Sequence, residues 1–210
     1  MPRGPSRARN HEQRQDKLQA ILAAAFDLFV ERGFADTRLD EVAARAGVAK
    51  GTIYLYVPSK TALFEELIRS AISTPIEGIE AQVAASELPL ESVLRLMFQR
   101  VREEVLETRR RDIARLIISE AGRFPEIAEL YHREVVSRGL RLLRGIVERA
   151  AARGEIRPSE LDRFPQLIIA PFVVALLWTS LFQEYEPLDV EAMLDAHVDL
   201  LMCAVKGASS

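Results

Sequence analysis

Residues 37–56 read TRLDEVAARAGVAKGTIYLY, and this stretch decides the fold of the N-terminal part of the chain. In its first half, apolar residues recur at the spacing of one helix face: Leu39, Val42, Ala43 and Ala46. Gly47 then stands where a helix ends, and a second short helix is expected over residues 50–56. Two short helices joined by a tight turn predict a helix-turn-helix, in which the first helix braces the second across the major groove of DNA.

The second helix of this motif carries the residue types that contact nucleic acid. Hydrogen-bond donors and aromatic rings suit phosphates and base edges, and here they belong to Lys50, Thr52, Tyr54 and Tyr56. Gly51 is unfavourable inside a helix unless another molecule must approach its backbone closely. A plain αα corner has the same periodicity, with Tyr54 packed inward and Lys50 as an ordinary surface charge. Composition therefore favours DNA binding more strongly than spacing does.

Helical signals continue on both sides of the motif. An apolar stripe predicts a helix over about residues 15–32, and Gly33 follows it as a left-handed cap. Thr37 and Asp40 have the spacing of a capping box. The Val57-Pro58 step stops the second helix of the motif, and Ser59 suits the N-cap of the next one.

The rest of the chain also reads as helices, and no sustained period-two alternation predicts a strand. The Thr74-Pro75 step is expected to interrupt one helix, with a loose segment after it. Further helices are expected over about residues 90–107, 112–121, 125–153, 159–183 with a kink at Pro171, and 190–206. The sequence thus predicts an all-α protein of about nine to ten helices. It divides into a flexible basic arm (1–14), a helix-turn-helix DNA-binding domain (15–60) and an effector-binding and dimerisation domain (61–210).

The net charge of −3 hides two oppositely charged parts. Residues 1–60 hold ten Lys+Arg against seven Asp+Glu, whereas residues 61–210 hold 18 against 24. Half of the N-terminal cations lie in or just after the arm: Arg3, Arg7, Arg9, Arg14 and Lys17. Such an arm can follow DNA phosphates or be a disordered tail. The acidic part repels DNA and leaves contact to the N-terminal part.

The segment from about Leu18 to Leu63 resembles the DNA-binding domain of the TetR (tetracycline-repressor) family of bacterial transcriptional regulators. The resemblance rests on the AAAFDLFVERGFADT run from Ala23, the EVAARAGVAKGTIYLYV run from Glu41 and the Ser59-Lys60 pair. It implies that base and phosphate contacts come from Thr37, Lys50, Gly51, Thr52, Tyr54, Tyr56 and Lys60. It also implies a ligand-responsive regulator, most simply a repressor, that binds a palindromic operator as a homodimer.

The C-terminal part resembles the family's helical regulatory domain in outline, and the segment AAARGEIRP from Ala150, which separates the last long helices, is similar to one found in the family. The apolar stretch from Leu167 to Leu181 offers more hydrophobic surface than one small domain hides, which favours a dimer over purely intrachain core. Ligand cavities combine aromatic side chains with a few polar ones. The candidate effector-contacting residues of these two kinds are Phe98, Arg102, Glu120, Phe172 and Trp178. Aromatic residues at helical spacing are also ordinary core.

Several functional classes lack their signatures. Cys203 is the one cysteine, so neither a disulfide within the chain nor a cysteine zinc site is expected, and a cytoplasmic location is favoured. The common nucleophile, nucleotide and zinc motifs are missing, so we expect no enzyme, metal or cofactor. The run from Phe164 to Phe182 suits a buried helix better than a membrane span, because polar residues and prolines interrupt it. A helical protein–protein adaptor and an all-α enzyme with an unrecognised site are the remaining alternatives.

Overall fold

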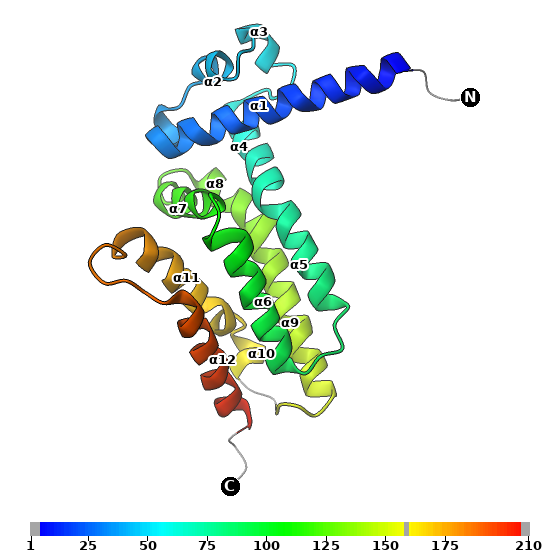
Figure 1. Cartoon of the computed structure of the whole chain (residues 1–210), viewed down its shortest axis with the longest axis vertical. Helices are drawn as coiled ribbons and strands as arrows, with labels where there is room; N and C mark the ends of the chain where they lie inside the picture. The colour runs from blue at the N-terminus through cyan, green and yellow to red at the C-terminus, as the bar shows by residue number, and fades with distance from the viewer. Residues whose placement is uncertain (1–4, 158–159, 207–210) are drawn as a thin grey trace. The chain divides into compact units, whose positions relative to one another are not determined.

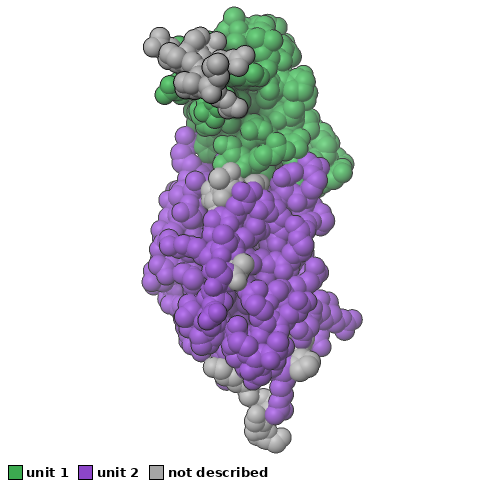
Figure 2. Space-filling model, turned by 90° about the vertical axis from the view of Figure 1, so that its right-hand side faces the viewer, with its two compact units in different colours: residues 1–70, 116–130 green, residues 71–115, 131–210 purple. Residues whose placement is uncertain are grey.

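The computed structural model describes residues 5–157 and 160–206, and within these residues every regular element is a helix. The all-α prediction is therefore confirmed. The chain forms two compact units (Figure 2). Unit 1, called the head, comprises residues 1–70 and 116–130, and unit 2 comprises residues 71–115 and 131–210. The assignment of residues 116–130 to the head was not anticipated, because these residues lie far from the helix-turn-helix in the sequence.

The head is built on α1 (Pro5–Asp36), against which α2 (Leu39–Arg45) and α4 (Lys60–Ile68) pack. The short α3 (Lys50–Ile53) packs on α2, which completes the predicted helix-turn-helix (Figure 1). Gly47 makes the turn between them with a φ of 68°. The tight turn holds α3 against α2 and leaves the other side of α3 open.

The helix α1 begins about ten residues earlier than its apolar stripe indicates, at Pro5. Residues 5–14, expected as part of a flexible arm, are thus helical, and residues 1–4 lie outside the described residues. One reason is composition: Glu12, Gln13, Arg14, Gln15 and Lys17 favour helix without forming an apolar face. A helix that is polar all round gives no hydrophobic periodicity by which to find it.

Aromatic side chains form the centre of the head. Phe29 and Phe64 are fully buried, and their rings meet edge-on with 5.3 Å between centroids. Phe34 contacts both, at 5.7 Å and 5.3 Å. Phe124, from the 116–130 segment, packs edge-on against Phe34 at 5.1 Å. The aromatic cluster, defined by Phe29, Phe34, Phe64 and Phe124, therefore joins α1, α4 and the inserted segment into one core.

Gly33 closes the regular part of α1 in a conformation that only glycine adopts without strain. Its φ of 80° and ψ of 172° lie in a region essentially closed to residues with a Cβ. A methyl group there would also lie 2.7 Å from the Glu120 carboxylate oxygen Oε1. The positive φ predicted at this position is confirmed, whereas the Glu120 carboxylate is the end of a flexible side chain and can move away from an added methyl group.

Gly33→Ala is therefore expected to lower the free energy of unfolding of the head by about 1–3 kcal/mol. Urea unfolding followed by circular dichroism measures it. Gly51→Ala is the matched control, since Gly51 has no positive φ and nothing within 4 Å of an added Cβ. Alanine there favours helix, so the control should be as stable as the parent or slightly more stable. Equal stability of the two variants would contradict the strain at Gly33.

Unit 2 is a helical bundle centred on α6 (Leu90–Val101), which packs against α5 (Thr74–Ala84), α9 (Ser137–Ala152) and α12 (Val190–Lys206) (Figure 1). The remaining helices are α7 (Arg110–Glu120), which runs on into the head segment, α8 (Pro125–Tyr131), α10 (Glu160–Arg163) and α11 (Gln166–Leu181). Of three five-residue π-helical segments in the described residues, η1 (Arg69–Ser73) and η3 (His132–Val136) join α-helices, and η2 (Arg102–Leu106) extends α6 up to the turn before α7. The main core is aliphatic and includes Leu94, Ile146, Ile168 and Val198.

The expected interruption at Thr74-Pro75 does not occur, because helix continues from α4 through η1 to the end of α5. Proline has no amide hydrogen for the carbonyl four residues earlier, which here belongs to Ala71. Arg110 supplies the missing donor: its Nε donates to the Ala71 oxygen at 2.7 Å. The wider turn of η1 directly precedes the proline, as is common where the helical ladder loses a bond.

The long helix expected over residues 159–183 is instead two, and the break lies at Phe164-Pro165 rather than at Pro171. Pro171 lies inside α11, and the carbonyl it leaves unpaired is that of Leu167. His197 of α12 approaches this carbonyl with Nε2 at 3.1 Å. A tertiary hydrogen bond thus lets the helix continue through the proline, and sequence periodicity contains no sign of it.

Within the described residues, no helix is long and apolar enough to cross a bilayer.

Candidate DNA-binding site

The second helix of the helix-turn-helix presents its polar residues outward. Ile53 is fully buried, whereas Lys50 and Gly51 are exposed and Tyr54 is 50% exposed. Helical turns continue beyond α3 as far as Tyr56, through hydrogen bonds such as that from the Tyr56 amide to the Ile53 oxygen at 3.0 Å. Of the predicted DNA-contacting residues in this segment, Lys50, Gly51 and Tyr54 are thus exposed, and Thr52 and Tyr56 are half-buried.

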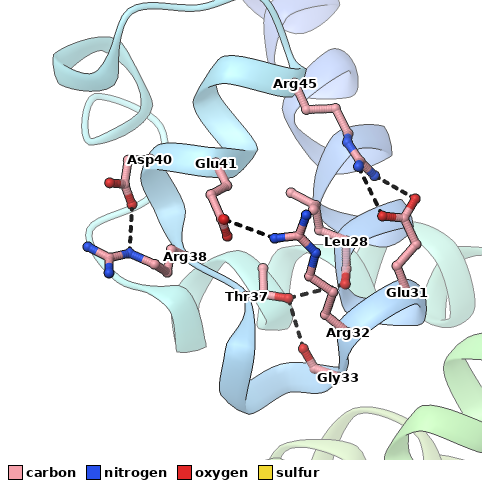
Figure 3. Close-up of polar contacts among 9 residues, drawn as sticks. All are labelled: Leu28, Glu31, Arg32, Gly33, Thr37, Arg38, Asp40, Glu41 and Arg45. Atoms are coloured by element: carbon pink, nitrogen blue, oxygen red, sulfur yellow. Dashed lines mark hydrogen bonds and ion pairs between the residues drawn. The ribbon is translucent and has the colours of Figure 1, made fainter.

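The cations of α2 and its surroundings are held by neighbouring carboxylates (Figure 3). Arg45 makes two hydrogen bonds to Glu31, at 2.7 Å and 2.9 Å. Arg32 pairs with Glu41 at 2.9 Å. These pairs tie α2 to α1, and they leave little positive charge free on this side of the head.

Asp40 contacts two cations at the start of α2, Arg38 at 3.4 Å and Lys50 at 3.5 Å. A hydrogen bond from its own backbone amide, then those cations, hold the pKa of the Asp40 carboxyl below its ordinary value. The Lys50 side chain remains 67% exposed, so this long contact is weak and screened by solvent. Lys50 can therefore exchange Asp40 for a phosphate or a base edge.

Thr37, one of the predicted DNA-contacting residues, has no side-chain surface: it is 1% exposed. Its hydroxyl donates to the backbone oxygens of Gly33 at 2.8 Å and Leu28 at 3.2 Å (Figure 3). The predicted capping box is also wrong, since the N-cap of α2 is Arg38 and no side chain caps it. The hydroxyl closes the C-terminal end of the preceding helix, whose carbonyls lack amide partners.

Lys60, which is expected to contact the DNA backbone, also makes contacts within the head. Its Nζ donates to the Ala35 oxygen at 2.8 Å and lies 4.7 Å from the centre of the Phe34 ring. Burial lowers the pKa of Lys60 below its ordinary value, and the carboxylates of Asp36 and Glu120 partly offset this. The side chain thus caps the end of α1. Ser59, just before it, accepts a hydrogen bond from the Ala62 amide at 3.1 Å, which confirms the predicted N-cap.

An open groove of about 410 Å³ lies where the N-terminal part of α1 meets the end of residues 50–56, the second helix of the helix-turn-helix with its last turn. It is lined by Gln13, Arg14, Lys17, Leu55 and Tyr56. The Arg14 guanidinium lies 5.7 Å from the centre of the Tyr56 ring. Sequence reasoning named Arg14 and Lys17 only as charges of an arm and did not single out Gln13 or Leu55. The sequence contains no signal for the role of Leu55, because its 74% exposure is seen only in the structure.

The five candidate effector residues belong to both units. Glu120 belongs to the head, beside Gly33, whereas the other four belong to unit 2. Phe98 is buried in the main core and meets the His197 ring edge-on at 6.2 Å. Arg102 pairs with Glu107 and, at 3.2 Å, with Glu191.

The two candidates on α11 have different surroundings. Trp178 donates from Nε1 to the Glu186 oxygen at 2.8 Å and packs edge-on against Phe182, so it closes the turn after the helix. Phe172 is half-buried against a second, small apolar cluster formed by Leu106, Ala114, Ala175 and Leu176. Of the five, Phe172 is the one that packs against this second cluster.

Comparison with known proteins agrees with this geometry. Residues 21–67 match the family described as "Bacterial regulatory proteins, tetR family", and residues 89–202 match "Tetracyclin repressor-like, C-terminal domain". A helix-turn-helix head joined to a helical bundle defines a DNA-binding transcriptional regulator with a separate regulatory domain. The chain belongs to the TetR family, and the resemblance seen in the sequence is confirmed.

Individual relatives span nearly the whole chain. The "Probable HTH-type transcriptional regulator ArpR" of Pseudomonas putida is 30% identical over 201 residues, which cover 92% of this chain and 95% of that protein. Among solved structures, NalD, the secondary repressor of the MexAB-OprM multidrug efflux pump in Pseudomonas aeruginosa, has a TM-score of 0.71 at 24% identity, covering 90% of this chain and 96% of that chain. FadR of Bacillus subtilis, solved in complex with stearoyl-CoA, has a TM-score of 0.67 at 22% identity, covering 89% and 98%. At these identities the two structures show the fold alone.

Proposed function

We propose that this regulator is a repressor that binds a palindromic operator as a homodimer and is released by a small-molecule effector. The outward surface of the helix-turn-helix carries the DNA-binding part of the proposal. Lys50, Gly51 and Tyr54 are exposed and Thr52 and Tyr56 are half-buried, while Thr37 and Lys60 make contacts within the head. Two recognition helices related by a two-fold axis enter successive major grooves, about 34–36 Å apart.

One exposed face of α11 supports the homodimer. Its large apolar side chains stand at helical spacing on the side away from the core: Val173, Val174, Leu177 and Leu181. On α12, Ala192, Ala196, Leu200 and Cys203 form a second exposed stripe of apolar or small side chains. Exposed apolar faces of this extent mark interaction surfaces, and the same two helices from a second copy complete a four-helix interface.

The second apolar cluster supports an effector site in unit 2. Phe172 and Leu106 flank the small residues Ala114 and Ala175, and Leu106 lies in the π-helical η2. Such π-helical segments are frequent at functional sites. The structurally similar FadR was solved in complex with stearoyl-CoA, a ligand with a long apolar acyl chain. A coupling of about 1–3 kcal/mol between effector and operator lowers DNA affinity roughly 5- to 150-fold.

Gel-shift with the DNA flanking the protein's own gene tests this function. We expect one palindromic fragment to shift in the presence of excess unrelated competitor DNA, and a screen of small molecules to identify one that abolishes the shift. Absence of any specific shift would contradict DNA recognition. Identical operator affinity with every molecule of the screen would contradict effector release alone.

Lys50→Ala combined with Tyr54→Phe is expected to weaken operator binding by about 1–3 kcal/mol while leaving the dimer intact, because the changes remove contacts to DNA and, within the head, only the long, solvent-exposed Lys50–Asp40 contact. Fluorescence anisotropy with the shifted fragment gives the affinity, and light scattering gives the mass. The matched control is Arg144→Ala with Tyr185→Phe, the same chemical changes at exposed positions of unit 2. Parent-like affinity of the Lys50 and Tyr54 variant would overturn the placement of the recognition surface.

A further inference from the structure

Two of the π-helical segments, η1 and η2, are held by the same side chain. Arg110, the first residue of α7, donates from Nε to the Ala71 oxygen of η1 at 2.7 Å. Its Nη1 donates to the Glu104 oxygen of η2 at 2.9 Å. One guanidinium therefore binds backbone carbonyls of two helical segments that are distant in the sequence.

Further contacts fix the Arg110 side chain in this position. Its Nη1 also pairs with the Glu104 carboxylate at 3.0 Å, and its backbone amide donates to Thr108 Oγ1 at 3.2 Å. The Thr108 hydroxyl donates in turn to the Glu104 backbone oxygen at 2.8 Å. A guanidinium is planar and its donors point in fixed directions, so these contacts hold η1 and η2 in one geometry.

The Ala71 carbonyl lies at the joint between the helix of the head and its continuation in unit 2. Ser70 is the last residue of the head before unit 2 begins at Ala71, and helix continues through η1 into α5. The helical ladder lacks one bond here, because Pro75 has no amide hydrogen. Prolines and π-helical turns are the places where helices kink. A hydrogen bond from a charged donor is stronger than a neutral one, so the Arg110 contact restricts bending at this joint.

We propose that Arg110 is a positioning residue for operator binding. By joining η1 to η2 it restricts the bend between α4 and α5, and with it the spacing of the two recognition helices in the dimer. The inference rests on the function proposed above, in which these helices must match major grooves about 34–36 Å apart. A dimer that samples many spacings is competent to bind for only a fraction of the time, and its apparent affinity falls by that fraction.

Arg110→Met tests this role, because it removes the donors and keeps most of the side-chain length. Operator affinity of the full-length protein should fall roughly 5- to 150-fold, the range of a typical coupling between distant sites, while affinity for a fragment with one half-site is unchanged. One base pair inserted between the half-sites should cost the variant less affinity than it costs the parent, since its spacing is less restricted. Fluorescence anisotropy measures all three affinities. Arg110→Lys keeps the charge and should regain part of the operator affinity.

Arg138→Met is the matched control, with the same substitution at a side chain that also reaches α5. Arg138 donates to Glu77 at 2.9 Å and to Glu80 at 2.7 Å, which are side chains beyond η1 rather than a carbonyl of the joint. Operator affinity and spacing preference of this control should equal those of the parent. Hydrogen–deuterium exchange should become faster at residues 69–78 in Arg110→Met but not in the control.

Parent-like operator affinity of Arg110→Met, or an equal loss for the single half-site, would overturn the inference. So would an equal loss in Arg138→Met, or unchanged exchange at residues 69–78. Circular dichroism checks the helix content of each variant, and Arg110→Lys carries the comparison if Arg110→Met does not fold. If the parent distinguishes no operator from unrelated DNA, the proposed function fails instead, whereas the exchange experiment needs no DNA and decides separately whether Arg110 holds the joint.

Discussion

Leu177→Arg is expected to convert the dimer to a monomer and to weaken operator binding at least 100-fold. Leu177 lies in the middle of the exposed apolar face of α11, between Val173 and Leu181. In a two-fold interface each substitution occurs twice, so two guanidinium groups are brought together in an apolar contact without partners. A monomer binds only one half-site of the operator. Loss of the second, linked half-site contact lowers the overall affinity by a factor of about 10²–10⁴.

Sedimentation velocity measures the mass, and fluorescence anisotropy measures operator affinity. Ala81→Arg, at an exposed position of α5, is the control for adding a cation to a helix surface, and it should remain dimeric. A Leu177→Arg protein that stays dimeric would place the interface elsewhere. A dimer that dissociates without loss of operator affinity would contradict the paired half-sites.

Phe64→Ala is expected to lower the free energy of unfolding of the head by about 3–5 kcal/mol. The ring is fully buried and contacts Phe29 and Phe34 edge-on, so its removal leaves a cavity where α1 and α4 meet. A domain of this size is stable by about 5–15 kcal/mol in total, so much of the head's stability would be lost. Operator affinity should fall with it, because α3 is held in place by the same core.

Urea unfolding with fluorescence and circular dichroism detection measures this change. The control is Val30→Ala on the same helix, where the side chain is 40% exposed and the expected cost is within about 0.5 kcal/mol. A cost of Phe64→Ala below about 1 kcal/mol would show that the aromatic cluster is not the centre of the head.

Much of the fold was accessible from the sequence because it depends on local chemistry. The apolar stripes of α1 and α6, the left-handed Gly33, the Ser59 cap and the start of α8 at Pro125 follow from neighbours within one or two turns. The polar character of α3 and the turn after it was accessible for the same reason, since Lys50, Thr52, Tyr54 and Tyr56 carry polar groups and Ile53 is buried. Helices that lack an apolar face, such as the first ten residues of α1, were not.

The fate of individual polar side chains was decided by partners distant in the sequence. Thr37 and Lys60 have the chemistry of DNA-contacting residues, yet both donate hydrogen bonds to backbone oxygens near the end of α1. Glu120, predicted to line an effector site, lies against Gly33 in the head. No local pattern encodes these contacts, because each depends on which surfaces the packing of helices brings together.

The prolines show the division between sequence and tertiary structure. From the sequence it follows that Pro75 and Pro171 each remove an amide donor from a helix. The all-α fold, the helix-turn-helix and the positive charge of residues 1–60 also follow from the sequence. That these helices nevertheless continue depends on contacts between helices, since Arg110 and His197 reach the carbonyls of Ala71 and Leu167 from other helices. The physical reason is that a helix needs its backbone groups satisfied, and a side chain from elsewhere in the fold satisfies them as well as a neighbouring amide does.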